Sequence, residues 1–308
     1  MLTLVVLFLA TALSPPTTNR MLLLSWQNNG IEVGLSLNET NVKETRLQAS
    51  QFHRFHSPIR FRNQRSRRQR RKLKNEVSLT QGDYDIVADA KPFCSGTDEL
   101  ESLALMRVKV VEKLRASALT VEDFERLQQI RPDAYGSLRL LRCLRKSKHQ
   151  DVAGSAERFL QYLEWRNENG IDELQVSSKV SEFCRSTFDV SLSDEPITVE
   201  MKVGNWNSRR LIQEIDRQML TVEEFVNYWI KLYEDLHSQL HNLSVNDGSN
   251  LAFANINADM KGLSLSQFSP TFMRRVGGPW LTTTQQNYPE TTATINLIHS
   301  PPVLSAVW

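Results

Sequence analysis

The stretch LAFANINADMKGLS, residues 251–264, decides the fold class of this chain. Apolar residues stand at every second position from Ala252 to Ala258, which is the pattern of a strand with one buried face. Asp259 and Gly262 follow, and an Asp at a strand end usually caps the next turn. We therefore expect a strand over residues 251–260 that ends in a turn where Asp259 has a structural role.

The segments on both sides extend this strand into an alternating pattern. Upstream, apolar and polar residues alternate from Ile197 to Val203, and Thr221-x-x-Glu224 is a capping box that opens a helix. Downstream, we expect a helix around residues 268–276 and a strand at 295–298. The resulting order of strand, helix, strand, helix and strand predicts an α/β domain over residues 185–308.

Helical spacing dominates the region before this domain. Apolar residues recur every three or four positions over residues 99–113, and Thr120 is placed to cap a second helix. Two more helices are expected at 138–144 and 152–169, the latter stopped by Gly170. We predict a small helical subdomain over residues 98–172, with order beginning near Asp98.

Residues 1–95 show no sustained helical or strand period, so we expect a poorly packed extension. Within it, residues 60–74 hold nine basic side chains and no acidic one. Such a run is attracted to anionic lipid headgroups by about 1 kcal/mol per cation. The alternatives are that it binds nucleic acid or an import receptor, or that it is a solvated tail. We predict membrane targeting, with no nucleic-acid partner, by Arg65, Arg67, Arg68, Arg70, Arg71 and Lys72.

An apolar run from Leu2 to Leu13 resembles a signal peptide, but it lacks a basic start. It is also shorter than the roughly 20 residues that span a bilayer as a helix. The three cysteines are odd in number and widely spaced, which favours a reducing compartment over a disulfide framework. We predict a cytoplasmic, peripheral membrane protein, and secretion is the alternative.

Catalytic and cofactor motifs are missing from the sequence. It contains no GxSxG, GxxxxGK[ST] or GxGxxG segment, which argues against a nucleophile elbow, a phosphate loop and a dinucleotide site. His237 and His241 are four residues apart, but no Glu stands between them and no third ligand is evident. We therefore expect neither an enzyme nor a metal or other cofactor.

Several short motifs follow one another in a recognisable order. LLRCLR (140–145), YLEWR (162–166) and GID (170–172) lie in the helical region, and DMKGLS (259–264), QNYPE (286–290), SP (300–301) and SAVW (305–308) lie in the sheet region. Together they resemble the CRAL-TRIO family, whose members carry phosphatidylinositol and phosphatidylcholine and whose relatives bind retinaldehyde or tocopherol. The resemblance covers residues 100–308 and implies an N-terminal helical region followed by a mixed sheet with helices.

This resemblance implies a lipid cavity and a headgroup site. Lys148 and Glu290 match the family positions that contact an inositol phosphate, whereas the positions that hold a choline phosphate are occupied here by Ala254 and Ile256. The alternating strand faces would line the cavity, or else fill an ordinary core, and we assign the lining to Val199, Met201, Ala254, Ile256 and Ala258. The gating helix and the last strand would lie beyond Trp308, so we expect a domain truncated at its C-terminal end.

The sequence thus predicts a module that binds and transfers a phospholipid, such as phosphatidylinositol, or another lipophilic ligand at a membrane surface. Two alternatives come from other classes of function. The chain is either an inactive fragment or interaction module, or a protein that works through its basic run at 60–74, directed to a membrane or the nucleus.

Overall fold

A computed structural model describes residues 79–115, 119–147, 151–194, 197–248 and 250–300. They form two compact units, which we describe separately. The helical unit comprises the described residues of 79–169 and 241–251, and the sheet unit comprises those of 170–240 and 252–300. The described part contains no helix long and apolar enough to cross a membrane.

The helical unit is built from helices whose starts and ends follow local signals. Thr120 Oγ1 accepts a hydrogen bond from the Asp123 amide, and Asp151 Oδ1 accepts one from the Gly154 amide, so two helices begin with capped amides. Helices α4, α7 and α8 pack against one another. The elements are α3 (Gln81–Asp85), η2 (Ala88–Phe93), α4 (Thr97–Leu114), α5 (Val121–Ile130), α6 (Pro132–Tyr135), α7 (Ser137–Lys146) and α8 (Val152–Glu168).

The described elements begin earlier than the expected start near Asp98. Helix α3 and the 3-10 turn η2 precede α4, and Val87, Ala90 and Phe93 are buried. Such short elements contain too few turns to produce a helical period in the sequence. Helices α4, α5, α7 and α8 lie where the sequence predicted them, whereas the short helix α6 was not predicted.

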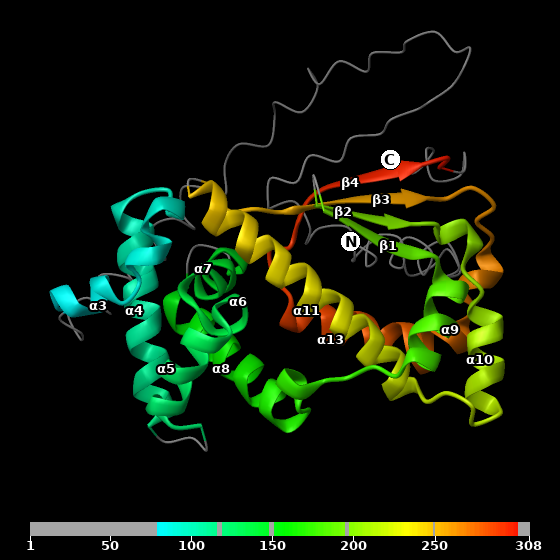
Figure 1. Cartoon of the computed structure of the whole chain (residues 1–308), viewed down its shortest axis with the longest axis horizontal. Helices are drawn as coiled ribbons and strands as arrows, with labels where there is room; N and C mark the ends of the chain where they lie inside the picture. Colours follow the sequence, from blue (N-terminus) through cyan, green and yellow to red (C-terminus); the bar gives the residue numbers. More distant parts are fainter. Residues whose placement is uncertain (1–78, 116–118, 148–150, 195–196, 249, 301–308) are drawn as a thin grey trace, which may run out of the picture. The chain divides into compact units, whose positions relative to one another are not determined.

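The sheet unit contains the expected alternation of strands and helices (Figure 1). Its regular elements are α9 (Ser178–Phe188), β1 (Val190–Asp194), β2 (Ile197–Met201), α10 (Ser208–Asp216), α11 (Val222–Asp247), β3 (Ala254–Asp259), α12 (Pro270–Phe272), α13 (Gly278–Asn287) and β4 (Thr292–Ile298). Residues 241–247 at the end of α11 belong to the helical unit. Shorter turns are η3 (Ile171–Glu173), η4 (Val203–Asn205), η5 (Leu265–Phe268) and the π-helical turn η6 (Met273–Gly277).

The four strands form one sheet in the order β1-β2-β3-β4. The first two make an antiparallel pair, and β2, β3 and β4 run parallel to one another. Helices α11 and α13 run along the sheet in Figure 1 and carry the connections between the parallel strands. The predicted class, a helical subdomain followed by a mixed α/β sheet, is confirmed.

Helix α11, which the capping box at Thr221 opens as predicted, runs to Asp247, and Gly248, at φ +67°, is the left-handed residue after it. Two other features differ from the sequence prediction. The helix expected over residues 268–276 is divided among η5, α12 and η6 and is followed by the separate helix α13. Strand β1 and helices α9 and α10 were not predicted.

Candidate functional site

The parallel strands give the sheet one apolar and one polar face. On the apolar face, Val199 of β2 lies opposite Ile256 of β3, which lies opposite Ile295 of β4. The next row on this face places Ala258 between two larger residues, Met201 and Leu297. All six side chains are buried. Period-two alternation in the sequence therefore marked this face correctly.

The five residues predicted to line a lipid cavity share this face. Exposed fractions run from 0% for Ala254 to 6% for Ile256, and Val199, Met201 and Ala258 lie between these values. Burial of this degree is expected both for an enclosed cavity lining and for a packed core. The lining role accordingly stays a prediction.

The opposite face carries a row of polar side chains joined across three strands. Asn296 Nδ2 donates to Asn257 Oδ1 at 2.8 Å, and Asn257 Nδ2 donates to Glu200 Oε1 at 2.6 Å. A second row joins Thr294 Oγ1 to Asn255 Oδ1 at 2.6 Å. These cross-strand bonds fix the register of β2, β3 and β4.

The DMKGLS motif forms the turn at the end of β3. The Lys261 amide donates to Asp259 Oδ1 at 2.8 Å, which confirms a structural role for that carboxylate. His299 Nδ1, after β4, lies 2.9 Å from the same oxygen. Burial alone would raise the pKa of Asp259, but the Lys261 amide and His299 hold it below its usual value.

Gly204 brings a second segment against this turn. A Cβ atom at this position would lie 1.8 Å from the Lys261 carbonyl oxygen, so the close approach of the two backbones requires glycine. Gln267 Nε2 donates to the Gly204 carbonyl at 2.6 Å. No local pattern in the sequence reveals this requirement, because Lys261 is distant from Gly204 along the chain.

The QNYPE motif packs against helix α11. Tyr288 OH donates to Glu234 Oε1 at 2.8 Å, and His237 Nε2 lies 3.0 Å from Thr291 Oγ1. The Tyr288 ring also stacks on Tyr233 with centroids 5.1 Å apart, and burial raises the pKa of Tyr233 to about 12. This polar cluster anchors the turn that leads into β4.

Of the two predicted headgroup residues, the structure places one. Glu290 is half-buried and has a left-handed backbone at φ +52°, which an L residue adopts at some strain. Lys148 lies outside the described residues, as do Arg65, Arg67, Arg68, Arg70, Arg71 and Lys72. The headgroup and membrane-targeting assignments therefore stay predictions.

Sequence reasoning missed an aromatic cluster in the sheet unit. Three tryptophans, Trp206, Trp229 and Trp280, lie with ring centroids 4.5 to 6.2 Å apart. Each is 2% exposed. They come from the segment before α10, from α11 and from α13, so only the fold brings them together.

The LLRCLR motif has a structural role in the helical unit that the sequence did not reveal. Arg145 donates from Nε and Nη2 to the two carboxylate oxygens of Glu99, at 3.0 and 2.9 Å. It also donates to the Phe93 carbonyl at 2.7 Å. Burial alone would raise the pKa of Glu99, but Arg145 and the Ser95 amide hold it below its usual value. This fork joins α7 to the start of α4.

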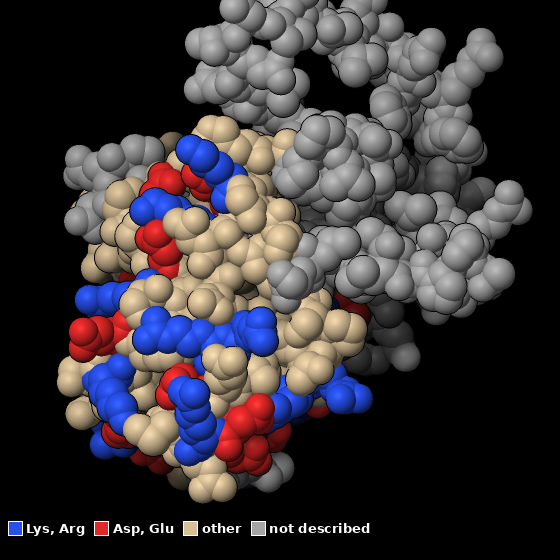
Figure 2. All heavy atoms as spheres, turned by 90° about the vertical axis from the view of Figure 1, so that its right-hand side faces the viewer, with Lys and Arg blue, Asp and Glu red and all other residues tan. Residues whose placement is uncertain are grey.

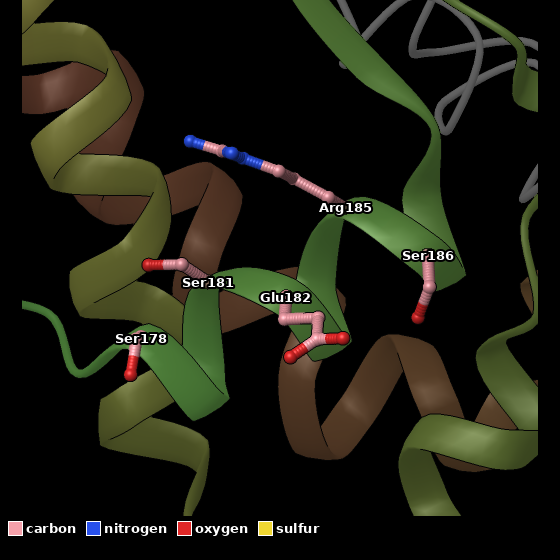
Figure 3. A pocket seen from close by; sticks show the side chains of 5 residues that line it. All are labelled: Ser178, Ser181, Glu182, Arg185 and Ser186. Carbon is pink, nitrogen blue, oxygen red and sulfur yellow. The ribbon is translucent and has the colours of Figure 1, made fainter.

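Helix α9 borders an open hollow of about 710 Å³ on the sheet unit. Its described lining consists of Ser178, Ser181, Glu182, Arg185 and Ser186, whose side chains all come from α9 (Figure 3). None of them belongs to the predicted cavity lining.

Charges of both signs alternate over the face that carries α9 and α10 (Figure 2). Several of them pair: Arg275 with Asp216 at 2.8 Å, and Lys202 with Asp189 at 3.1 Å. Pairs of this kind at an exposed surface contribute about 0 to 1 kcal/mol. This face thus presents mixed charge to solvent and not a basic patch. Within the described ranges, no three His, Cys, Asp or Glu side chains are grouped to hold a metal ion.

Together the two units define a helical region followed by a mixed α/β sheet, the arrangement that the CRAL-TRIO resemblance implies. Among solved structures, the chain is similar to the crystal structure of Sfh5, with 15% identity and a TM-score of 0.45. The match covers 70% of this chain and 75% of that one. No family model and no curated protein matches the sequence. Because the structural likeness is distant, the functional argument rests on the chain's own residues.

Proposed function

We propose that this chain is a binding module, not a catalyst, that holds a lipophilic ligand against the apolar face of its sheet. The proposed ligand is a phospholipid such as phosphatidylinositol, which the module carries between membranes. The observation that supports this most is the pair of small residues, Ala254 and Ala258, on β3, which has strands on both sides. Larger side chains, Met201 on β2 and Leu297 on β4, flank Ala258, so the side chain is smallest at the centre of this row.

The energetic basis of such binding is burial of hydrocarbon. Transfer of each CH₂ group from water contributes about 0.8 kcal/mol, so an acyl chain gains far more from an apolar surface than from one polar contact. Apolar residues cover the face over three strands: Val199 and Met201 on β2, Ile256 on β3, and Ile295 and Leu297 on β4. The motif resemblance to lipid carriers supports the same function.

A matched pair of alanine-to-leucine substitutions tests the proposal. Ala258→Leu adds volume on the apolar face, and Ala293→Leu makes the same change at an exposed position on β4. Each purified protein is incubated with phosphatidylcholine vesicles containing phosphatidylinositol, reisolated, and analysed for bound lipid by mass spectrometry. We expect the native chain and Ala293→Leu to retain lipid, and Ala258→Leu to retain about tenfold less because its side chain occupies ligand space.

Two results would contradict this proposal. One is a native chain that retains no more lipid than an unrelated protein of similar size. The other is an Ala258→Leu variant that folds and retains as much lipid as Ala293→Leu. Circular dichroism of each variant separates loss of ligand space from loss of fold.

The headgroup preference is a finer part of the proposal. Lys148 and Glu290 are assigned to a phosphoinositide headgroup, and a charge-assisted bond to phosphate contributes roughly 1.5 to 3 kcal/mol. Lys148→Ala should therefore lower retention of phosphatidylinositol by about tenfold or more while leaving other lipophiles bound. Equal losses for all lipids would argue against a headgroup role.

The basic run is proposed to bring the module to anionic membranes. Residues 60–74 carry nine cations, and each contributes about 1 kcal/mol near such a surface. Deletion of this run should abolish sedimentation with phosphatidylserine vesicles at low salt and leave lipid retention intact. A deletion that sediments like the native chain would contradict this assignment.

A further inference from the structure

The aromatic cluster of the sheet unit contains buried polar groups without hydrogen-bond partners. The indole Nε1 atoms of Trp206, Trp229 and Trp280 have none, although each side chain is at least nine-tenths buried. The hydroxyl of Thr187, a residue that is 1% exposed, is also unpartnered. Groups of this kind are rare in native proteins, and each one calls for a physical explanation.

These groups lie in one neighbourhood. Ring centroids are 4.5 Å apart for Trp229 and Trp280, 6.2 Å for Trp206 and Trp229, and 6.1 Å for Trp206 and Trp280. Phe188, which directly follows Thr187, has its ring centroid 5.3 Å from that of Trp206. The Thr187 carbonyl accepts a hydrogen bond from the Asn207 amide, next to Trp206. The three indoles therefore belong to a single cluster, and the backbone of Thr187 lies beside it.

Their chemistry specifies the group that would satisfy them. An indole N–H only donates, and the Thr187 hydroxyl is also able to donate. A buried donor without a partner destabilises the protein, because it has lost its hydrogen bonds to water and gained none in return. What the cluster lacks is thus an acceptor oxygen, and the remaining surface around it is aromatic and apolar.

We infer that the Trp206–Trp229–Trp280 cluster binds the carbonyl oxygen of a lipophilic ligand, in an ester, ketone or aldehyde group. This inference rests on the proposed function, because it requires that the chain accept a lipophile. It adds a preference: an acceptor-bearing ligand binds better than a hydrocarbon of equal size. A carbonyl oxygen has two lone pairs and so accepts from more than one indole at a time.

The test compares two probes that differ in the acceptor. Methyl decanoate carries an ester, and tridecane is the alkane with the same number of non-hydrogen atoms. Affinities of the full chain are measured through quenching of tryptophan fluorescence. The key variants replace Trp206, Trp229 and Trp280 one at a time by 3-benzothienylalanine, which keeps the ring size and replaces N–H by sulfur. The same replacement at Trp165, a half-buried residue of the helical unit, is the matched control.

For the native chain and the Trp165 control, we expect the ester to bind more tightly than the alkane. In at least one cluster variant, the ratio of ester to alkane affinity should fall about tenfold, as expected when a buried acceptor loses its donor. Trp229→Phe also removes the N–H and should lower this ratio as well. Because it uses a natural amino acid, it tests the inference even if 3-benzothienylalanine is not incorporated.

The outcomes separate the inference from the proposed function. Binding of both probes with an unchanged ratio in all cluster variants would overturn the inference, and water or neighbouring ring faces would then satisfy the indoles. The proposed lipid-binding function would survive that result. If neither probe binds, the proposed function itself fails, and the inference fails with it.

Discussion

The interiors of the two units are stabilised by different interactions. The helical unit buries charge: Glu99 and Arg166 are almost inaccessible, and each has close polar partners. The sheet unit also buries Glu234, but around Trp229 it buries aromatic rings and leaves indole donors unpartnered. Directional bonds specify a single arrangement, whereas apolar contacts are non-directional and tolerate an added hydrocarbon. This difference is consistent with the proposal that the sheet unit accepts a lipophilic ligand.

The largest effect is expected from removing the central ring of the aromatic cluster. Trp229→Ala deletes a side chain that contacts Trp206, Trp280, Phe188 and Phe225. The free energy of unfolding, measured by urea titration, should fall by about 3 to 5 kcal/mol. Trp165→Ala, at a half-buried site of the helical unit, should cause a clearly smaller loss. Equal losses would show that the cluster is not the main core of its unit.

A smaller but pH-dependent effect is expected in the helical unit. Glu99→Gln removes the charge that Arg145 binds with two hydrogen bonds. At neutral pH it should lower the free energy of unfolding by roughly 2 to 3 kcal/mol, the range for hydrogen bonds to a charged group. Ser95→Ala keeps the carboxylate and the Arg145 fork and should have little effect.

The sign of the pH dependence follows from the lowered pKa of Glu99. Burial opposes ionisation, but Arg145 and the Ser95 amide outweigh it and hold the folded pKa below the ordinary value of 4.5. The contribution of Glu99 to the free energy of unfolding is therefore fully present above pH 4.5. It is lost as pH falls through the pKa of Glu99 in the folded protein. Urea titrations of the native chain and Glu99→Gln should converge in this acidic range. A difference that stays constant down to low pH would contradict the linkage.

Close backbone packing in the sheet unit supplies the next prediction. Gly204→Ala forces a shift, because the new Cβ atom would lie 1.8 Å from the Lys261 carbonyl oxygen. We expect a loss of about 1 to 3 kcal/mol in the free energy of unfolding. Gly96→Ala, in the helical unit, meets nothing within 4 Å and should stay within about 0.5 kcal/mol of the native chain.

The smallest effect concerns the polar face of the sheet. Asn257→Ala removes hydrogen bonds to Glu200 and Asn296 that are partly open to solvent. We expect a loss of about 1 kcal/mol by thermal unfolding. Ser191→Ala, at an exposed position on β1, is the control and should be close to neutral. A loss as large as that of Trp229→Ala would mean that polar bonds, and not ring packing, hold the sheet unit together.

Local signals in the sequence predicted much of this fold. The capping box at Thr221 and Glu224 forms both of its hydrogen bonds, and the alternation from Ala254 to Ala258 marks the buried face. Strand β1 was not predicted, although apolar Val190 and Leu192 alternate with Ser191 and Ser193 within it. A short strand of this kind is identified by its partner β2.

The candidate site was less accessible to sequence reasoning. Glu99 and Arg145 are 46 residues apart, and the three tryptophans of the cluster come from different segments, so no local pattern links them. The resemblance to lipid carriers named Glu290 but did not indicate Trp229 or its unpartnered indole. Tertiary packing creates such groupings, and a pattern read along one segment does not contain them.

Native mass spectrometry of the purified full chain is the most direct test of the central claim that the sheet unit accommodates a lipophile. We expect a population heavier than the bare polypeptide by the mass of one lipid, which collisional activation releases and which Ala258→Leu largely loses. A spectrum of bare polypeptide alone, unchanged after incubation with vesicles containing phosphatidylinositol, would contradict it.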